Sequence, residues 1–128
     1  MRRGAGGWLV AGCIVLMSQG ALGANLSASL RNFYAEYEIV LQCQEQAELG
    51  AADAALAKAA IAKIEMHYLQ RDSSIDKDRL LKEAVAHKDE GFRIATRSGR
   101  SDLRPYCRMS LNELLAKAEE IDPSGKGQ

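Results

Sequence analysis

Apolar residues recur every three or four positions along much of the chain, which is the period of an amphipathic helix. One such stripe predicts a helix over residues 27–49; its members are Leu26, Leu30, Phe33, Tyr37 and Val40. Cys43 continues this stripe by three positions, so its side chain should face the core. Gly50 is expected to end the helix, because glycine readily adopts the left-handed conformation that follows many helix ends.

Two further helices are predicted over residues 51–71 and 76–97, joined by the polar connection 72–74. The apolar face of the first should contain Leu56, Ala60, Ile64 and Tyr68. The apolar face of the second should contain Leu81, Val85, Phe92 and Ala95, with Leu80 and Ala84 beside them. Gly91 lies inside the second helix, where it indicates either a bend or a close contact with a neighbouring helix.

The last third of the chain is less regular because Pro105 interrupts the helical pattern. Ser110 and Glu113 have the spacing of a capping box, in which each side chain bonds a backbone amide at the start of a helix. This pattern predicts a final helix over residues 111–121. Whether residues 100–121 form one helix or two is left open.

The connections between these helices are short, and short connections favour antiparallel neighbours. The predicted fold class is therefore all-α, an up-and-down bundle of about four helices in a single domain at residues 24–121. Residues 122–128 are expected to be a disordered tail.

The first 23 residues have the layout of a secretory signal peptide. Two arginines precede an apolar run at residues 8–17, which is too short to span a membrane, and a small-residue stretch follows. Cleavage is expected after Gly23 or Ala24, leaving a mature chain of about 104 residues. The alternative is that Cys13 is lipidated and anchors the chain to an envelope membrane, because residues 10–13 also fit a lipoprotein cleavage site.

Cys43 and Cys107 are the two cysteines that remain after cleavage. An even pair in a small exported domain predicts one disulfide, which here would close a loop of about 65 residues. Two free or redox-active thiols are the competing interpretation, but the chain has no C-x-x-C motif to favour it.

Charge and aromatic content exclude some classes of partner. Without the two N-terminal arginines the chain has 15 basic and 17 acidic residues, a net charge of −2. That balance argues against a dedicated nucleic-acid binder, and few aromatic residues are present to stack on bases or sugars.

No motif for catalysis, metal binding or cofactor binding is recognisable. His67 and His87 are the only histidines, and no zinc, haem, serine-nucleophile or phosphate-loop pattern accompanies them. Acidic pairs such as Glu36 and Glu38 are expected to lie solvated on helix surfaces. The chain is therefore predicted to be a non-enzymatic protein without metal or cofactor.

A series of arginines is the most distinctive charged feature, and it gives residues 91–108 a net charge of +4. The series consists of Arg93, Arg97, Arg100, Arg104 and Arg108. One interpretation is a docking patch for an acidic protein, an anionic lipid headgroup or a polyanionic envelope component. The alternative is internal pairing, because the disulfide would bring Glu45 and Glu48 close to Arg104 and Arg108.

The sequence therefore predicts a periplasmic or secreted binding protein that uses a helical surface to engage a protein partner, as an adaptor, inhibitor or immunity protein does. A second hypothesis is a small-molecule or metal-sensing module, with a cavity near Ala55, Ala59 and Ala62 or a site built on both histidines. A third is a periplasmic stress chaperone that exposes apolar surface at low pH. The sequence does not predict the oligomeric state.

Overall fold

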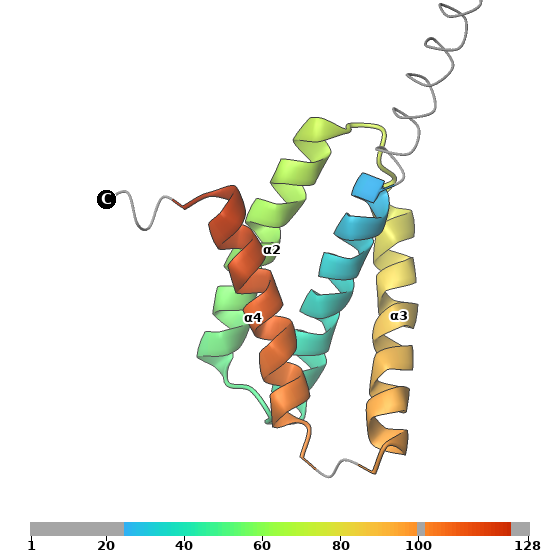
Figure 1. Ribbon diagram of the computed structural model, residues 1–128, viewed down its shortest axis with the longest axis vertical. Coiled ribbons are helices and arrows are strands. Elements are labelled where there is room, and N and C mark those ends of the chain that lie inside the picture. Colours follow the sequence, from blue (N-terminus) through green and yellow to red (C-terminus); the bar gives the residue numbers. More distant parts are fainter. Residues whose placement is uncertain (1–24, 100–101, 124–128) are drawn as a thin grey trace, which may run out of the picture.

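The alanine-, leucine- and glutamate-rich segments form four helices in the computed structural model, which describes residues 25–99 and 102–123 (Figure 1). They are an N-terminal helix over residues 25–45, α2 (Ala51–Arg71), α3 (Lys77–Arg97) and α4 (Arg104–Ile121). Consecutive helices run in opposite directions, and the described residues contain no strand. The predicted all-α, four-helix bundle is confirmed.

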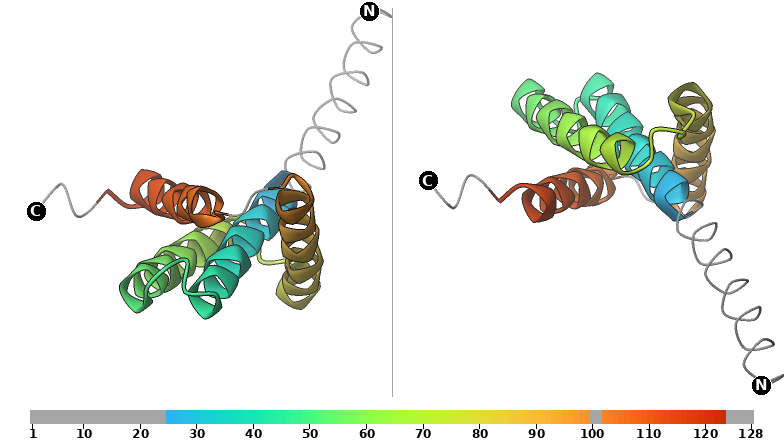
Figure 2. Two further views of the ribbon diagram at one scale, coloured as in Figure 1. Left: turned by 90° about the horizontal axis from the view of Figure 1, so that it is seen from below. Right: turned by 90° about the horizontal axis from the view of Figure 1, so that it is seen from above.

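The N-terminal helix lies between α2 and α3, while α4 crosses in front of it and packs on α2 (Figures 1 and 2). α3 and α4 meet where α3 ends and α4 begins. There the rings of Phe92 and Tyr106 are edge-to-face, with centroids 5.4 Å apart. From that contact the two helices diverge along the N-terminal helix.

The core is formed by apolar side chains from all four helices. Its largest fully buried aliphatic side chains are Leu30, Val40, Ile64, Leu80, Leu111 and Leu114. Cys43 and Cys107 lie in the same core with no exposed surface. Their sulfurs form the predicted disulfide, which links the N-terminal helix to the first turns of α4.

The N-terminal helix ends at residue 45, four residues before its predicted end. The left-handed conformation after it is adopted by Ala47, with φ of 63°, and the amide of Glu48 donates to the carbonyl of Cys43. Gly50 was wrongly assigned as the residue that ends this helix. It is extended and caps the start of α2, where its amide donates to the carboxylate of Asp53 at 3.2 Å.

The predicted bounds of α2 are confirmed, and α3 begins one residue later than predicted because Asp76 caps it. The side chain of Asp76 accepts a hydrogen bond from the Arg79 amide. The predicted inner faces were partly wrong: Leu56 is 53% exposed and Val85 is 40% exposed. Ala57 and Ala84 are buried instead, each one position along the chain from the exposed side chain.

α4 begins at Arg104, about two turns before the predicted start at residue 111, so a single helix extends to Ile121. Pro105 lies in its first turn, where a missing amide hydrogen costs nothing. The predicted capping box was wrong, because Ser110 lies inside the helix and is only 1% exposed.

Candidate functional site

The signal peptide, its cleavage site at Gly23 or Ala24, and the lipidation alternative at Cys13 all lie outside the described residues. The buried Cys43–Cys107 disulfide is compatible with an oxidising, exported compartment. None of the helices in the described ranges is long and apolar enough to cross a membrane.

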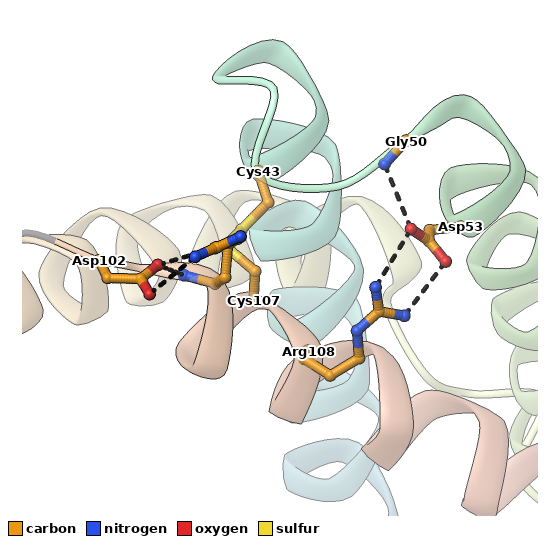
Figure 3. The surroundings of a disulfide bond; sticks show 7 residues. Cys43, Gly50, Asp53, Asp102, Cys107 and Arg108 are labelled. Carbon is orange, nitrogen blue, oxygen red and sulfur yellow. Dashed lines mark hydrogen bonds and ion pairs between the residues drawn. A yellow bond between two sulfur atoms is a disulfide. The ribbon is translucent and has the colours of Figure 1, made fainter.

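Two of the five arginines, Arg104 and Arg108, lie in the first turns of α4. Figure 3 shows Arg108 beside the disulfide and directed to Asp53. The guanidinium of Arg108 contacts both carboxylate oxygens of Asp53 on α2, at 3.2 and 3.5 Å. Arg104 contacts Asp102 at 3.1 Å. The Gly50 amide, followed by Arg108, lowers the pKa of Asp53 by hydrogen bonding to its charged form.

The remaining arginines are divided between α3 and the connection after it. Arg93 pairs with Glu90 one turn earlier, and this pairing lowers the pKa of Glu90. Arg97 is exposed near the end of α3, while Arg100 lies outside the described residues. Three members of the series therefore have an acidic partner within the chain.

The internal pairing differs in detail from the prediction. Glu48 does lie close enough to Arg104 to help raise the pKa of that guanidinium, after the stronger effect of Asp102. Arg108 instead pairs with Asp53, which the sequence did not indicate. Asp53 could have been noticed as the acid three residues after Gly50, at the expected start of α2.

The two histidines lie in different surroundings. His67 contacts Arg71 at 3.2 Å and the edge of the Tyr68 ring. His87 borders a separate cleft beside α3. Among the residues that the structure describes, no three His, Cys, Asp or Glu side chains are grouped so that they could hold a metal ion.

A groove of about 680 Å³ runs along the outer face of α4; we call it the α4 groove. Phe33 of the N-terminal helix lines it together with Pro105, Arg108, Met109, Asn112, Glu113, Ala116, Lys117 and Glu120. Met109 is 55% exposed within it. The ammonium of Lys117 lies 5.9 Å from the centres of the Phe33 and Tyr68 rings, so this cation lies over two aromatic side chains.

A second hollow, of about 550 Å³, lies between the N-terminal helix, α3 and α4; we call it the three-helix cleft. Its apolar walls include Phe33, Ala35, Ile39 and Met109. Its polar residues are Ser29, Arg31, Asn32, Glu36, His87, Tyr106, Ser110 and Glu113.

Glu36 is the half-buried acid of this cleft, and its predicted location on a solvated surface was wrong. Burial raises its pKa, and the nearby carboxylate of Glu113 raises it further. The buried hydroxyl of Ser110 donates a hydrogen bond to Glu36, which partly opposes both effects.

Tyr106 and Gly91 both line the cleft, and the Tyr106 hydroxyl lies against Gly91 of α3. A Cβ atom at residue 91 would lie 2.5 Å from that hydroxyl oxygen, so this glycine permits the close helix contact that was one of its two predicted roles. Burial, followed by the charge of Glu36, raises the pKa of Tyr106.

The alanine-lined cavity predicted near Ala55, Ala59 and Ala62 was wrong, because all three residues are exposed on α2. Small-molecule-sized space lies instead on the other side of the N-terminal helix, beside α3 and α4.

No family model, no curated protein and no solved structure matches this chain. The function must therefore be inferred from the contacts and surfaces of the chain itself.

Proposed function

We propose that this chain is an exported, non-enzymatic binding protein that engages a protein partner through the outer face of α4. Two features support export: the signal-like pattern of residues 1–23 and a disulfide that an oxidising compartment would maintain.

The α4 groove is the observation that carries the proposal. Its apolar members follow the axis of α4 at helical spacing, starting at Pro105 and continuing through Met109 to Ala116, with Phe33 beside them. Charges of both signs border this strip at Arg108, Glu113, Lys117 and Glu120. A groove with apolar residues along a helix and charged residues at its borders is a surface into which the apolar face of an amphipathic helix can pack. The proposed partner therefore presents such a helix.

The arginines at the start of α4 contribute charge to one end of this surface. Arg104 and Arg108 are exposed, and their pairs with Asp102 and Asp53 are solvent-accessible. Ion pairs of this kind contribute little to stability, so an acidic residue of a partner can replace the internal carboxylate at small cost. An acidic residue near the corresponding end of the partner helix is therefore expected.

Site-specific crosslinking in the native envelope tests this proposal. A photo-reactive amino acid replaces Asn112, which borders the groove, and in a control chain replaces Ala86, which is exposed on α3. One discrete crosslinked species is expected from residue 112 and none from residue 86. Ala116→Arg should remove that species because it fills the groove, whereas the matched Ala86→Arg should leave it unchanged.

Two outcomes would contradict the proposal. Equal crosslinking from residues 112 and 86 to many proteins would indicate unselective, chaperone-like binding. A discrete species that survives Ala116→Arg would place the partner on another surface. Circular dichroism of both arginine variants confirms that each remains folded.

A further inference from the structure

We propose that the three-helix cleft binds a small organic cation, a primary amine with an apolar substituent. The cleft and the α4 groove share Phe33, Met109 and Glu113, but Glu36 and Gly91 border only the cleft, and Asn112 and Ala116 border only the groove. Variants at these unshared residues therefore test this inference separately from the proposed function.

The cleft carries negative charge that the described residues do not neutralise. Glu36 and Glu113 face each other across it, and neither forms an ion pair with a described residue. Arg31 borders the cleft but is directed to the carboxylate of Glu83, at 3.9 Å. His87 is exposed at the rim on α3. A bound cation would therefore offset the repulsion between the Glu36 and Glu113 carboxylates, which costs more because Glu36 is half-buried.

Three groups that line the cleft can accept hydrogen bonds from a primary ammonium. Two acceptors are the carboxylates of Glu36 and Glu113, and the third is the phenol oxygen of Tyr106. The Tyr106 hydroxyl has no hydrogen-bond partner among the described residues, although it lies in a half-buried position.

The acceptors on α4 are placed by helical spacing. Tyr106, Ser110 and Glu113 follow one another at intervals of four and three residues, so they lie on one face of α4. That face is turned to Glu36, which lines the same cleft and whose pKa Ser110 lowers by hydrogen bonding to it. The site is therefore held on two helices that the disulfide also joins.

The apolar walls select an organic ligand over a hydrated inorganic ion. Phe33, Ile39 and Met109 line the cleft beside the acids, and a hydrated ion would gain nothing from contact with them. A volume of about 550 Å³ suits a ligand of small-molecule size. An aromatic or branched alkyl group next to the ammonium would fill this part of the cleft.

Titration of the purified chain with phenethylamine at pH 7.5, followed by NMR, tests the inference. Saturable shifts are expected at residues of the cleft, including the amide of Gly91. 3-Phenylpropionate, which has a similar apolar body and the opposite charge, should cause none. Glu36→Gln should weaken phenethylamine binding by about tenfold or more, because it removes a half-buried counter-charge. The matched change Glu45→Gln, on an exposed residue of the same helix, should leave binding unchanged.

Three results would overturn the inference: no saturable shift up to about 10 mM amine, equal binding of the amine and the carboxylate, or undiminished binding by Glu36→Gln. If Glu36→Gln does not fold, Glu113→Gln replaces it, since Glu113 is exposed on α4 and its carboxylate borders the same cleft. Retained binding in that variant would equally count against the site.

Discussion

Glu36 lies half-buried on the N-terminal helix, where it accepts a hydrogen bond from Ser110 and faces Glu113. The sequence did not indicate this position, because Glu36 and Glu38 look alike when only helical spacing is considered. Glu36 differs because it faces the side of α4 that contains Ser110 and Glu113. The prediction could not place these two residues along α4, because the predicted start of that helix was also wrong.

The raised pKa of Glu36 predicts a pH-dependent change in stability for Glu36→Gln. Because the folded protein holds this proton more tightly than the unfolded chain does, ionisation of Glu36 lowers stability as pH rises through its raised pKa. Glutamine removes the charge but can still accept the hydrogen bond from Ser110. Thermal unfolding should show Glu36→Gln more stable than wild type by a few degrees at pH 7, and no more stable below the ordinary glutamate pKa.

Glu45→Gln is the matched control for this measurement, because Glu45 is exposed on the last turn of the same helix. Its unfolding temperature should stay close to that of wild type at both pH values. If Glu36→Gln lowered stability at pH 7, the hydrogen bond from Ser110 to a charged carboxylate would outweigh burial, contrary to the order of effects inferred for this site.

Among the helices, α2 was predicted best and α4 worst, and the difference has a physical cause. Local signals bound α2 on both sides: the extended Gly50 precedes it and Asp72 follows it. α4 begins at Arg104, and the residue before it, Leu103, provides no side-chain cap. Its local start signals are Pro105 in the first turn, which was wrongly predicted to interrupt the helix, and Asp102, whose carboxylate accepts a hydrogen bond from the Arg104 amide at 3.0 Å. The Cys107 disulfide and the Arg108–Asp53 pair, which are contacts with distant parts of the chain, also hold the first turns.

The contact between α3 and α4 depends on Gly91 and Tyr106, and a double-mutant cycle can measure it. In an exposed helix, Gly→Ala would stabilise by about 1 kcal/mol. Here the new Cβ would lie 2.5 Å from the Tyr106 hydroxyl, so Gly91→Ala should bring no gain in the free energy of unfolding while Tyr106 is present. In a Tyr106→Phe background the oxygen is absent, and Gly91→Ala should raise the free energy of unfolding by about 1 kcal/mol.

Urea unfolding of the four proteins in this cycle gives the coupling energy directly. A coupling near zero, with Gly91→Ala stabilising equally in both backgrounds, would show that the Tyr106 side chain moves aside freely. The close approach of α3 and α4 would then not depend on the glycine.

The whole molecule is organised around the N-terminal helix, which has polar or covalent links to each of the other three. Its Tyr34 donates a 2.6 Å hydrogen bond to Glu65 of α2. Its Gln42 accepts one from Lys88 of α3 at 3.0 Å. Its Cys43 is bonded to Cys107 of α4. Both α2 and α3 lie within the loop that this disulfide closes, so the cross-link restricts most of the unfolded chain.

Replacement of both half-cystines, Cys43→Ala with Cys107→Ala, tests how much of the global stability depends on this restriction. For a sequence separation of 64 residues, the chain-entropy model gives a loss of about 4 kcal/mol in the free energy of unfolding. That loss is a large share of the roughly 5–15 kcal/mol available to a small domain. Urea unfolding followed by circular dichroism measures it, and the reduced wild type controls for the volume lost in the alanine variant.

Similar losses in the reduced protein and in the double alanine variant would attribute the effect to the cross-link, because the reduced protein keeps both sulfur atoms. A loss below about 1 kcal/mol in the reduced protein would contradict the prediction. The Arg108–Asp53 pair and the packing of α4 on α2 would then be sufficient to hold α4 in place, and the three-helix cleft would keep its shape without the disulfide.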